Sequence, residues 1–376
     1  DMGADTPTGF GAVLYRGNAG RLDVSGFGFS PDMVWIKPTT TGDHHRLCDT
    51  VRGVKKSLTV NETSAESTSS NNFLEAFNPD GFTIDTADGG WNSASHYYIA
   101  WGWDMGDTTA TNTSGTISSQ VRANPTYGQS IVSYTGNATS GATVGHGLTS
   151  APEMVIVKSR TTSATDWWTY HTSTGATHAL RLNSTAAALD DASIWNDTTP
   201  TNALFSLGNY ADINKSGEPL IAYCFHSVSG YSKIGSFSGT GSANNSVTGL
   251  GFRPSWIMVK RTDSGDQWLI VDSTRTPLGD TTGNNLYADS SAAEGGGSST
   301  AIQFDSNGFT VKGTDTMVNA SGGTYIYMAF AGGMDSISDY NTTGSIDSRV
   351  KANPTYGQSI VSWTGNGGAA TVGHGL

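Results

Sequence analysis

The 376-residue sequence has few charged residues, very little glutamate and only two cysteines. Lys, Arg, Asp and Glu together make up 14% of the chain, against roughly a quarter in ordinary globular proteins. Most of the 32 acidic residues are Asp, which favours turns, whereas Glu favours helices. The composition therefore predicts an all-β protein. The six glutamates are Glu62, Glu66, Glu75, Glu153, Glu218 and Glu294.

The scarcity of positive charge and of long apolar runs limits the classes of binding partner that the chain can have. A net charge of −12 argues against nucleic acid, because phosphate binding needs clustered Lys and Arg. No apolar run approaches the length that spans a bilayer, so we expect no membrane insertion. Cys48 and Cys224 form no disulfide framework, and both lie in apolar strand-like runs, so we expect buried free thiols.

The motifs of common catalytic sites are also missing. The sequence has no G-x-S-x-G, H-E-x-x-H, phosphate-binding Gly-Lys loop or EF-hand pattern, and its glutamates are too scattered for a glycosidase pair. Neighbouring residues of a strand point to opposite faces, so His44 and His45 are poorly placed to share a metal ion. His45 aligns with Trp168 and Trp268, which indicates a packing role. We therefore expect no enzyme, no catalytic residue, no metal and no cofactor.

What the sequence does contain is a repeat. An apolar run that follows Pro and ends in Lys occurs three times, as PDMVWIK, PEMVIVK and PSWIMVK. An aromatic-x-Gly segment precedes each run, and a closing run such as YYIAWGW or PLIAYCF follows it. Several ordered matches in each unit indicate tandem modules. The Pro and Lys positions of the repeat are Pro31, Lys37, Pro152, Lys158, Pro254 and Lys260.

The repeats predict three complete modules and the start of a fourth. The complete modules are expected at residues 12–105, 121–227 and 228–333, and the first hairpin of an incomplete module at 350–376. Residues 1–11, 106–120 and 334–349 are expected to be linkers, the first of them leading from a preceding module. Shared motifs group the first module with the third and the second with the last, which predicts a two-module tandem of about 225 residues that continues beyond the chain.

Each module contains seven or eight short runs rich in β-branched and aromatic residues, bounded by Gly, Asn, Ser and Pro. This pattern predicts an antiparallel β-sandwich of the jelly-roll or lectin-like kind. The MVWIK-type runs are apolar at every position, so we expect a central strand that is covered on both faces. Pro can begin such a strand, and the Lys at its end is expected to mark where the strand reaches water.

Seven of the ten tryptophans fall on repeat lines and are expected to pack in the sheets: Trp35, Trp101, Trp103, Trp168, Trp256, Trp268 and Trp363. Trp91 and Trp195 lie off those lines, in polar loops beside Asn92 and Asn196. An exposed aromatic face next to an amide suits the apolar face and the hydroxyls of a sugar ring. These four residues are the candidate glycan-binding residues, and packing against the module's own sandwich is the alternative.

The motifs resemble those of modular structural proteins of tailed bacteriophages, especially marine and cyanobacterial ones. The resemblance rests on the aromatic-x-Gly-Asn start, GFGFSPDMVWIK, the DTVRG turn from Asp49 to Gly53, DGFTI and the closing YYIAW. It implies concanavalin A-like or jelly-roll modules in a tail fibre or another virion surface component. The second module departs from the pattern because it lacks the GFT element.

The resemblance and the composition together give the expected function. We expect a non-enzymatic, extracellular structural or adhesion protein of the virion surface that displays β-sandwiches and binds a host cell-surface glycan or receptor. We also expect a homo-oligomer that contacts further copies of itself or other virion proteins. Two alternatives stay open, namely a bacterial surface adhesin or filament subunit, and a glycan depolymerase on a jelly-roll scaffold.

Overall fold

The computed structural model describes residues 9–68, 73–276 and 284–332, together with 339–341, 345, 348–353, 358–363, 365 and 368–374. Within these ranges the regular structure is almost entirely antiparallel β-sheet, which confirms the expected all-β fold. Three four-residue helices occur in the described residues: α1 (Ala192–Trp195), α2 (Ala211–Asn214) and α3 (Thr316–Asn319).

The first module contains a large and a small antiparallel sheet. The large sheet has the order β1-β9-β3-β4-β5-β6, and the small sheet the order β2-β8-β7. Its strands are β1 (Phe10–Arg16), β2 (Arg21–Ser25), β3 (Met33–Pro38), β4 (Arg46–Asp49), β5 (Lys56–Thr59), β6 (Ser67–Thr68), β7 (Leu74–Asn78), β8 (Gly81–Asp85) and β9 (Tyr97–Trp103).

The second module repeats this order with an extension. Its large sheet runs β10-β11-β12-β19-β14-β15-β16-β17, and β13 pairs with β18 in the small sheet. Its strands are β10 (Thr109–Asn112), β11 (Ser119–Asn124), β12 (Gln129–Thr135), β13 (Ala142–Gly145), β14 (Met154–Ser159), β15 (Trp168–His171), β16 (His178–Arg181), β17 (Leu189–Asp190), β18 (Leu204–Leu207) and β19 (Pro219–Phe225).

The third module has the order β20-β27-β22-β23-β24 in its large sheet and β21-β26-β25 in its small sheet. Its strands are β20 (Ser232–Ser238), β21 (Asn245–Thr248), β22 (Trp256–Arg261), β23 (Leu269–Asp272), β24 (Leu286–Tyr287), β25 (Ile302–Asp305), β26 (Gly308–Val311) and β27 (Thr324–Phe330). A separate sheet is formed by β28 (Asp339–Asn341), β29 (Ser348–Asn353) and β30 (Gln358–Trp363).

The central strands are buried on both faces, as the sequence predicts. In β3, Val34 and Ile36 pack inside the first sandwich, whereas Met33 and Trp35 point the other way. The same alternation holds in β14 and β22. One face of each large sheet therefore covers its own small sheet, and the other face is buried against the neighbouring modules.

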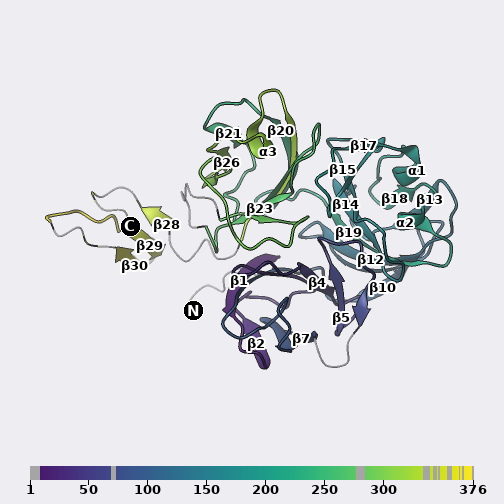
Figure 1. The fold of residues 1–376 in the computed structure, drawn as a ribbon, viewed down its shortest axis with the longest axis horizontal. Coiled ribbons are helices and arrows are strands. Elements are labelled where there is room, and N and C mark those ends of the chain that lie inside the picture. The colour runs from purple at the N-terminus through teal and green to yellow at the C-terminus, as the bar shows by residue number, and fades with distance from the viewer. Residues whose placement is uncertain are drawn as a thin grey trace.

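The outer faces of the three large sheets meet in one shared core. Figure 1 shows the three modules, purple to blue, teal and green, around a common centre. The shared core contains Trp35, Trp101 and Trp103 of the first module, Trp167, Tyr223 and Phe225 of the second, and Trp256, Trp268 and Phe330 of the third. Burial of each large apolar side chain stabilises the assembly by roughly 1.5–3 kcal/mol.

The GFT motif of the first and third modules has a steric cause. Gly81 begins β8 directly against the backbone of β2, and a Cβ atom there would collide with the carbonyl oxygen of Val24. Gly308 stands in the same relation to Val247. The second module lacks this motif, and its small sheet has two strands instead of three.

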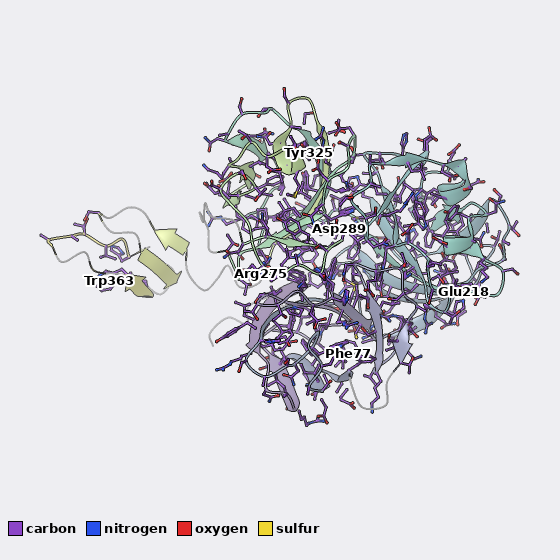
Figure 2. The ribbon with its side chains drawn as sticks, in the orientation of Figure 1. Phe77, Glu218, Arg275, Asp289, Tyr325 and Trp363 are labelled. Atoms are coloured by element: carbon purple, nitrogen blue, oxygen red, sulfur yellow. The ribbon has the colours of Figure 1, made fainter. Side chains whose placement is uncertain are left out.

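Three sequence expectations about strands and sheet packing differ from the structure. Residues 334–349, expected to be a linker, contain β28 and the first two residues of β29 in the described part of that segment. Residues 106–120, expected to be a linker, contain β10 and the start of β11, because these strands extend the large sheet of the second module beyond β12. Trp363, expected to pack in a sheet, exposes 55% of its surface in β30 (Figure 2). Its counterpart Tyr134 in β12 is buried beneath Phe205 of the small sheet.

Candidate functional site at the junctions between the modules

The three modules are joined head to tail in a closed ring by equivalent backbone hydrogen bonds. At each junction an amide that follows β5, β16 or β24 donates to a carbonyl just beyond the central strand of the next module. These bonds are Glu66 to Arg160 (2.7 Å), Ala188 to Thr262 (2.9 Å) and Glu294 to Thr39 (2.8 Å). The third of them returns from the third module to the first and closes the ring.

The repeated lysines belong to these junctions, and the expectation that they meet water is wrong. Lys37, Lys158 and Lys260 are fully buried. Each ammonium donates to a carbonyl of its own module and to one of the preceding module in the ring. The bonds across the junctions join Lys37 to Ser291 (3.2 Å), Lys158 to Thr63 (3.2 Å) and Lys260 to Thr185 (3.1 Å). Burial lowers the pKa of each lysine to about 8.

The residue directly before β4, β15 and β23 directs a nitrogen of its aromatic side chain toward the neighbouring module. Trp167 Nε1 donates to the Thr59 carbonyl over 3.1 Å, and Trp268 Nε1 donates to the Arg181 carbonyl over 2.9 Å. The residue of the first module at this position is His45, which is fully buried. Its counterparts are thus Trp167 and Trp268, not Trp168, and its packing role is confirmed. Burial lowers the pKa of His45 well below its ordinary value, so the ring is neutral.

Buried ion pairs reinforce two of the three junctions. Asp49 binds Arg52 in the first module, with 2.5 Å between Oδ2 and Nε, and accepts a hydrogen bond of 2.7 Å from the Tyr223 hydroxyl of the second module. Asp272 binds Arg275 over 2.7 Å in the third module. In Figure 2 Arg275 lies where the third module adjoins the first.

A glutamate completes each of these two charged junctions. Glu66 bridges Arg52 of its own module (3.2 Å) and Arg160 of the second module (3.0 Å). Burial raises the pKa of Glu66, but the hydrogen bond from Arg160 and the charge of Arg52 outweigh it, so the pKa lies below its ordinary value. Glu294 binds Arg275 of its own module over 3.1 Å, and only its backbone amide reaches the first module, at the Thr39 carbonyl.

The junction between the second and third modules lacks these ion pairs. The positions of Asp49, Arg52 and Glu66 are occupied there by His171, Thr174 and Ala188, which have short or neutral side chains. The pKa of His171 is lowered to about 4 by burial, so the imidazole carries no charge at neutral pH. A cavity of about 620 Å³ lies at this junction, and Thr174, Ala188 and Thr262 are among the residues that line it.

The sequence-predicted candidates Trp91 and Asn92 lie elsewhere and are fully buried. The Trp91 ring packs on Phe73 with 5.2 Å between centroids, within the core of the first sandwich. The Asn92 amide donates to the Gly20 carbonyl (2.5 Å) and accepts from the Asn18 backbone amide (2.9 Å). Neither side chain is available to a sugar, because the loop folds inward to cover the apolar edge of the sandwich.

The second predicted pair, Trp195 and Asn196, also has a structural role. Trp195 is buried in the second sandwich, edge-on to Tyr170. Asn196 caps the C-terminus of α1 with a left-handed backbone (φ 54°), and its Oδ1 accepts from the Ser140 hydroxyl over 2.8 Å. The expectation of an exposed stacking platform is therefore wrong at both tryptophans, and the alternative of packing is what the structure has.

The repeated prolines and the two cysteines lie as the sequence predicts. Pro31, Pro152 and Pro254 precede β3, β14 and β22, and all three are buried. Cys48 and Cys224 are buried free thiols, and burial raises the pKa of both to about 12. No group of three potential metal ligands occurs within the described ranges. No helix described there is long and apolar enough to cross a membrane.

Sequence reasoning missed the residues that distinguish one junction from another. These residues can be found in the sequence as positions where the second module differs from the other two. Glu66, Ala188 and Glu294 stand eight residues after Leu58, Leu180 and Leu286, and Arg52, Thr174 and Arg275 stand three residues after Asp49, His171 and Asp272. In each triplet the second module has the uncharged residue, which is the feature that leaves its junction with the third module open.

A model of a protein family matches residues 6–333 and 335–376, and its description is "Domain of unknown function (DUF7483)". The first matched segment spans all three modules without a break, and the second begins after β27. Comparison with curated proteins found no match, and comparison with solved structures found none either.

Proposed function

Because the chain belongs to the DUF7483 family, whose description leaves the function open, we propose a function from the molecule's own geometry. The chain is a non-enzymatic structural and attachment protein that acts outside the cell. It displays a closed three-module unit for contact with a host-surface glycan. The motif resemblance to tailed-phage proteins supports a place in a tail fibre or elsewhere on the virion surface.

The observation that carries this proposal is the shared core of the three modules. Three sandwiches that close around one core and are tied by equivalent hydrogen bonds form a single unit instead of three separate beads. Such a unit holds its surface loops in a fixed arrangement, as a display scaffold must. The buried charged groups Asp49, Arg52 and Glu66 connect modules, so their chemistry is that of assembly.

The composition of the surface supports attachment through weak contacts. Charged residues are few, and Ser, Thr and Gly are abundant. Neutral hydroxyl-rich surfaces bind weakly, and repetition of the same unit along a fibre converts weak binding into avidity. We therefore expect a single copy of the chain to bind glycans with low affinity and a multivalent form to bind strongly.

Glycan-array binding by the full chain tests this proposal. The biotinylated chain is applied as a monomer and as a streptavidin-linked tetramer. We expect the tetramer to bind a restricted set of glycans that the monomer binds weakly. The absence of binding by the tetramer contradicts the attachment function, and release of reducing sugar from bacterial polysaccharide would show a depolymerase instead.

A further inference from the structure

We propose that the open junction between the second and third modules binds a neutral saccharide. This inference rests on the proposed attachment function and gives that function a site. The cavity is formed by the ends of β20, β22 and β27 of the third module and by the turn after β15 and the segment before β17 of the second. Its volume of about 620 Å³ lies within the range of small-molecule sites in proteins.

The ring explains why the cavity occurs at this junction. Where the first module meets the second, Arg52, Glu66 and Arg160 contact one another across the boundary. The residues at the same three positions between the second and third modules are Thr174, Ala188 and Thr262, and all three line the cavity. Two arginines and a glutamate are thus replaced by two threonines and an alanine, and the volume that they would fill is left empty.

The polar lining of the cavity matches the hydrogen-bonding groups of a sugar. Ser173, Ser236 and Ser238 are exposed in the cavity wall and present hydroxyls, each of which both donates and accepts. His178 also lines the cavity, and its Nδ1 lies 2.8 Å from the Thr177 hydroxyl, which leaves Nε2 as its second hydrogen-bonding atom.

A carboxylate stands among these hydroxyls. Asp263 is held in place by Arg261, whose Nε lies 3.0 Å from Oδ1, and by the Thr324 amide at 3.1 Å. The hydrogen bond from Arg261 lowers the pKa of Asp263 to about 2, so the group is ionised at neutral pH. A carboxylate has about four acceptor sites, so it can also accept from adjacent hydroxyls of a ligand. Arg261 also binds Asp266 over 3.3 Å, so the two carboxylates and the one guanidinium carry a net negative charge. This charge disfavours anionic ligands and selects a neutral sugar over an acidic one.

The apolar part of the cavity supplies a surface for the C–H face of a sugar ring. Ile326, Ala187 and Ala188 contribute it. Phe237 and Tyr325 stack on the opposite face of β20 and β27, inside the third sandwich, with 5.0 Å between centroids and 14° between ring planes. Tyr325, labelled in Figure 2, is itself fixed by a hydrogen bond of 2.6 Å from its hydroxyl to the Thr316 carbonyl. The strands that carry Ser236 and Ile326 are therefore held in place by a packed aromatic pair on their inner face.

Saturation-transfer NMR on the full chain tests the site with glucose, galactose, mannose and N-acetylglucosamine as neutral probes and N-acetylneuraminic acid as the anionic probe. Two variants block the cavity in different ways. Thr174→Arg combined with Ala188→Glu introduces the residues found at the other junctions. Ser236→Trp adds bulk at a position where the first module has the exposed Leu14, and both residues pair with the central isoleucine of the closing strand.

The matched control is Ser133→Trp. Ser133 occupies the same register position in β12, opposite Ile221, but its junction is filled by the Arg52–Glu66–Arg160 cluster. We expect saturation transfer to at least one neutral sugar in the wild type and in Ser133→Trp, and at least a tenfold weaker signal in both blocked variants. Because the two blocked variants differ in their chemistry, misfolding of one leaves the other as the test.

Three results would overturn the assignment: no transfer to any neutral probe, equal transfer to N-acetylneuraminic acid, or unchanged transfer in a folded blocked variant. The glycan array separates this site from the proposed function. Array binding that persists in both blocked variants would retain the attachment function and refute this site. If the wild-type chain binds no glycan on the array, the attachment function itself is refuted.

Discussion

The indole Nε1 of Trp101 donates a hydrogen bond of 3.1 Å to Oδ2 of Asp272, which lies 171 residues later in the chain. This bond joins β9 of the first module to β23 of the third and lies across the junction that closes the ring. The Tyr223 hydroxyl and Asp49 form the equivalent contact between the second and first modules. The same strand positions therefore make successive junctions, with different donors.

Replacement of Asp272 by Ala should destabilise the whole assembly. The change removes the acceptor of Trp101 and leaves the buried Arg275 without its 2.7 Å partner. Loss of one member of a buried pair costs about 3–5 kcal/mol. Chemical denaturation measures the difference. Glu75→Ala, which breaks a partly exposed pair with Lys55, is the control and should cost less than about 1 kcal/mol. Equal effects of the two substitutions would contradict the account.

Glu218 should make the second module sensitive to acid. Burial raises the pKa of this carboxyl, but hydrogen bonds from Ser159, Thr161 and Thr162 outweigh it and hold the pKa at about 2, below its ordinary value of 4.5. A lowered pKa adds stability that is complete above the ordinary pKa and is lost as the pH falls through the folded-state value. The unfolding free energy of wild type should exceed that of Glu218→Gln, and this difference should decrease by roughly 3 kcal/mol as the pH falls from 6 to 2.

Unfolding free energies measured across this pH range test the acid prediction. Glu62→Gln is the control, because Glu62 is exposed and pairs with His44 at the surface. The difference in unfolding free energy between wild type and Glu218→Gln could instead stay constant down to pH 2. That result would show that Glu218 has an ordinary affinity for protons in the folded protein.

The three junction lysines should make stability rise with pH in the alkaline range. Each has a pKa of about 8 in the folded protein, lowered by burial from the ordinary value of 10.5. Between these two values the unfolded chain binds a proton that the folded chain has lost, so alkali favours folding. Below about pH 8 both states are protonated, and the contribution is constant.

Comparison with Lys158→Met isolates one of these lysines. The free-energy difference between wild type and this variant should grow in favour of wild type by up to about 1.4 kcal/mol per pH unit between pH 8 and pH 10. Buried tyrosines and cysteines affect both proteins equally and cancel. Lys215→Met, at an exposed lysine, should show no such slope. A flat difference for Lys158→Met would contradict the buried location.

Trp91→Ala and Trp195→Ala should act on stability and leave glycan binding unchanged in the folded fraction. Both rings are buried within their own sandwiches, and removal of a buried Trp side chain costs about 3–5 kcal/mol. Thermal unfolding and array binding are measured on the same samples. Loss of binding in a variant with unchanged stability would restore the tryptophans as ligand contacts.

The sequence predicts the all-β fold and its strands well, because hydrophobic alternation and turn residues are local signals. The apolar run from Met33 to Ile36 indicates a strand that is covered on both sides, and the structure confirms this. The same signals do not say what covers the second face. The structure shows that the modules cover one another, through a core built from residues up to about 300 positions apart.

Local patterns failed where a residue's surroundings come from another module. Lys37, Lys158 and Lys260 end apolar strands and were expected at the water boundary, yet a loop of the neighbouring module covers each of them. Trp91 was expected to be exposed because its neighbours in sequence are polar, although its loop folds onto Phe73. The open junction can be recognised in the sequence only when Thr174 and Ala188 are compared with the charged residues at the same positions of the other two junctions.

Hydrogen exchange on the full chain, read by mass spectrometry, tests the closed ring most directly. The amides of β9 in the first module are compared between wild type and Asp272→Ala, whose substitution lies in the third module. The ring predicts that β9, from Tyr97 to Trp103, exchanges faster in the variant because Trp101 loses its partner across the junction. Faster exchange confined to the third module, with β9 unchanged, would show that the first and third modules are not joined.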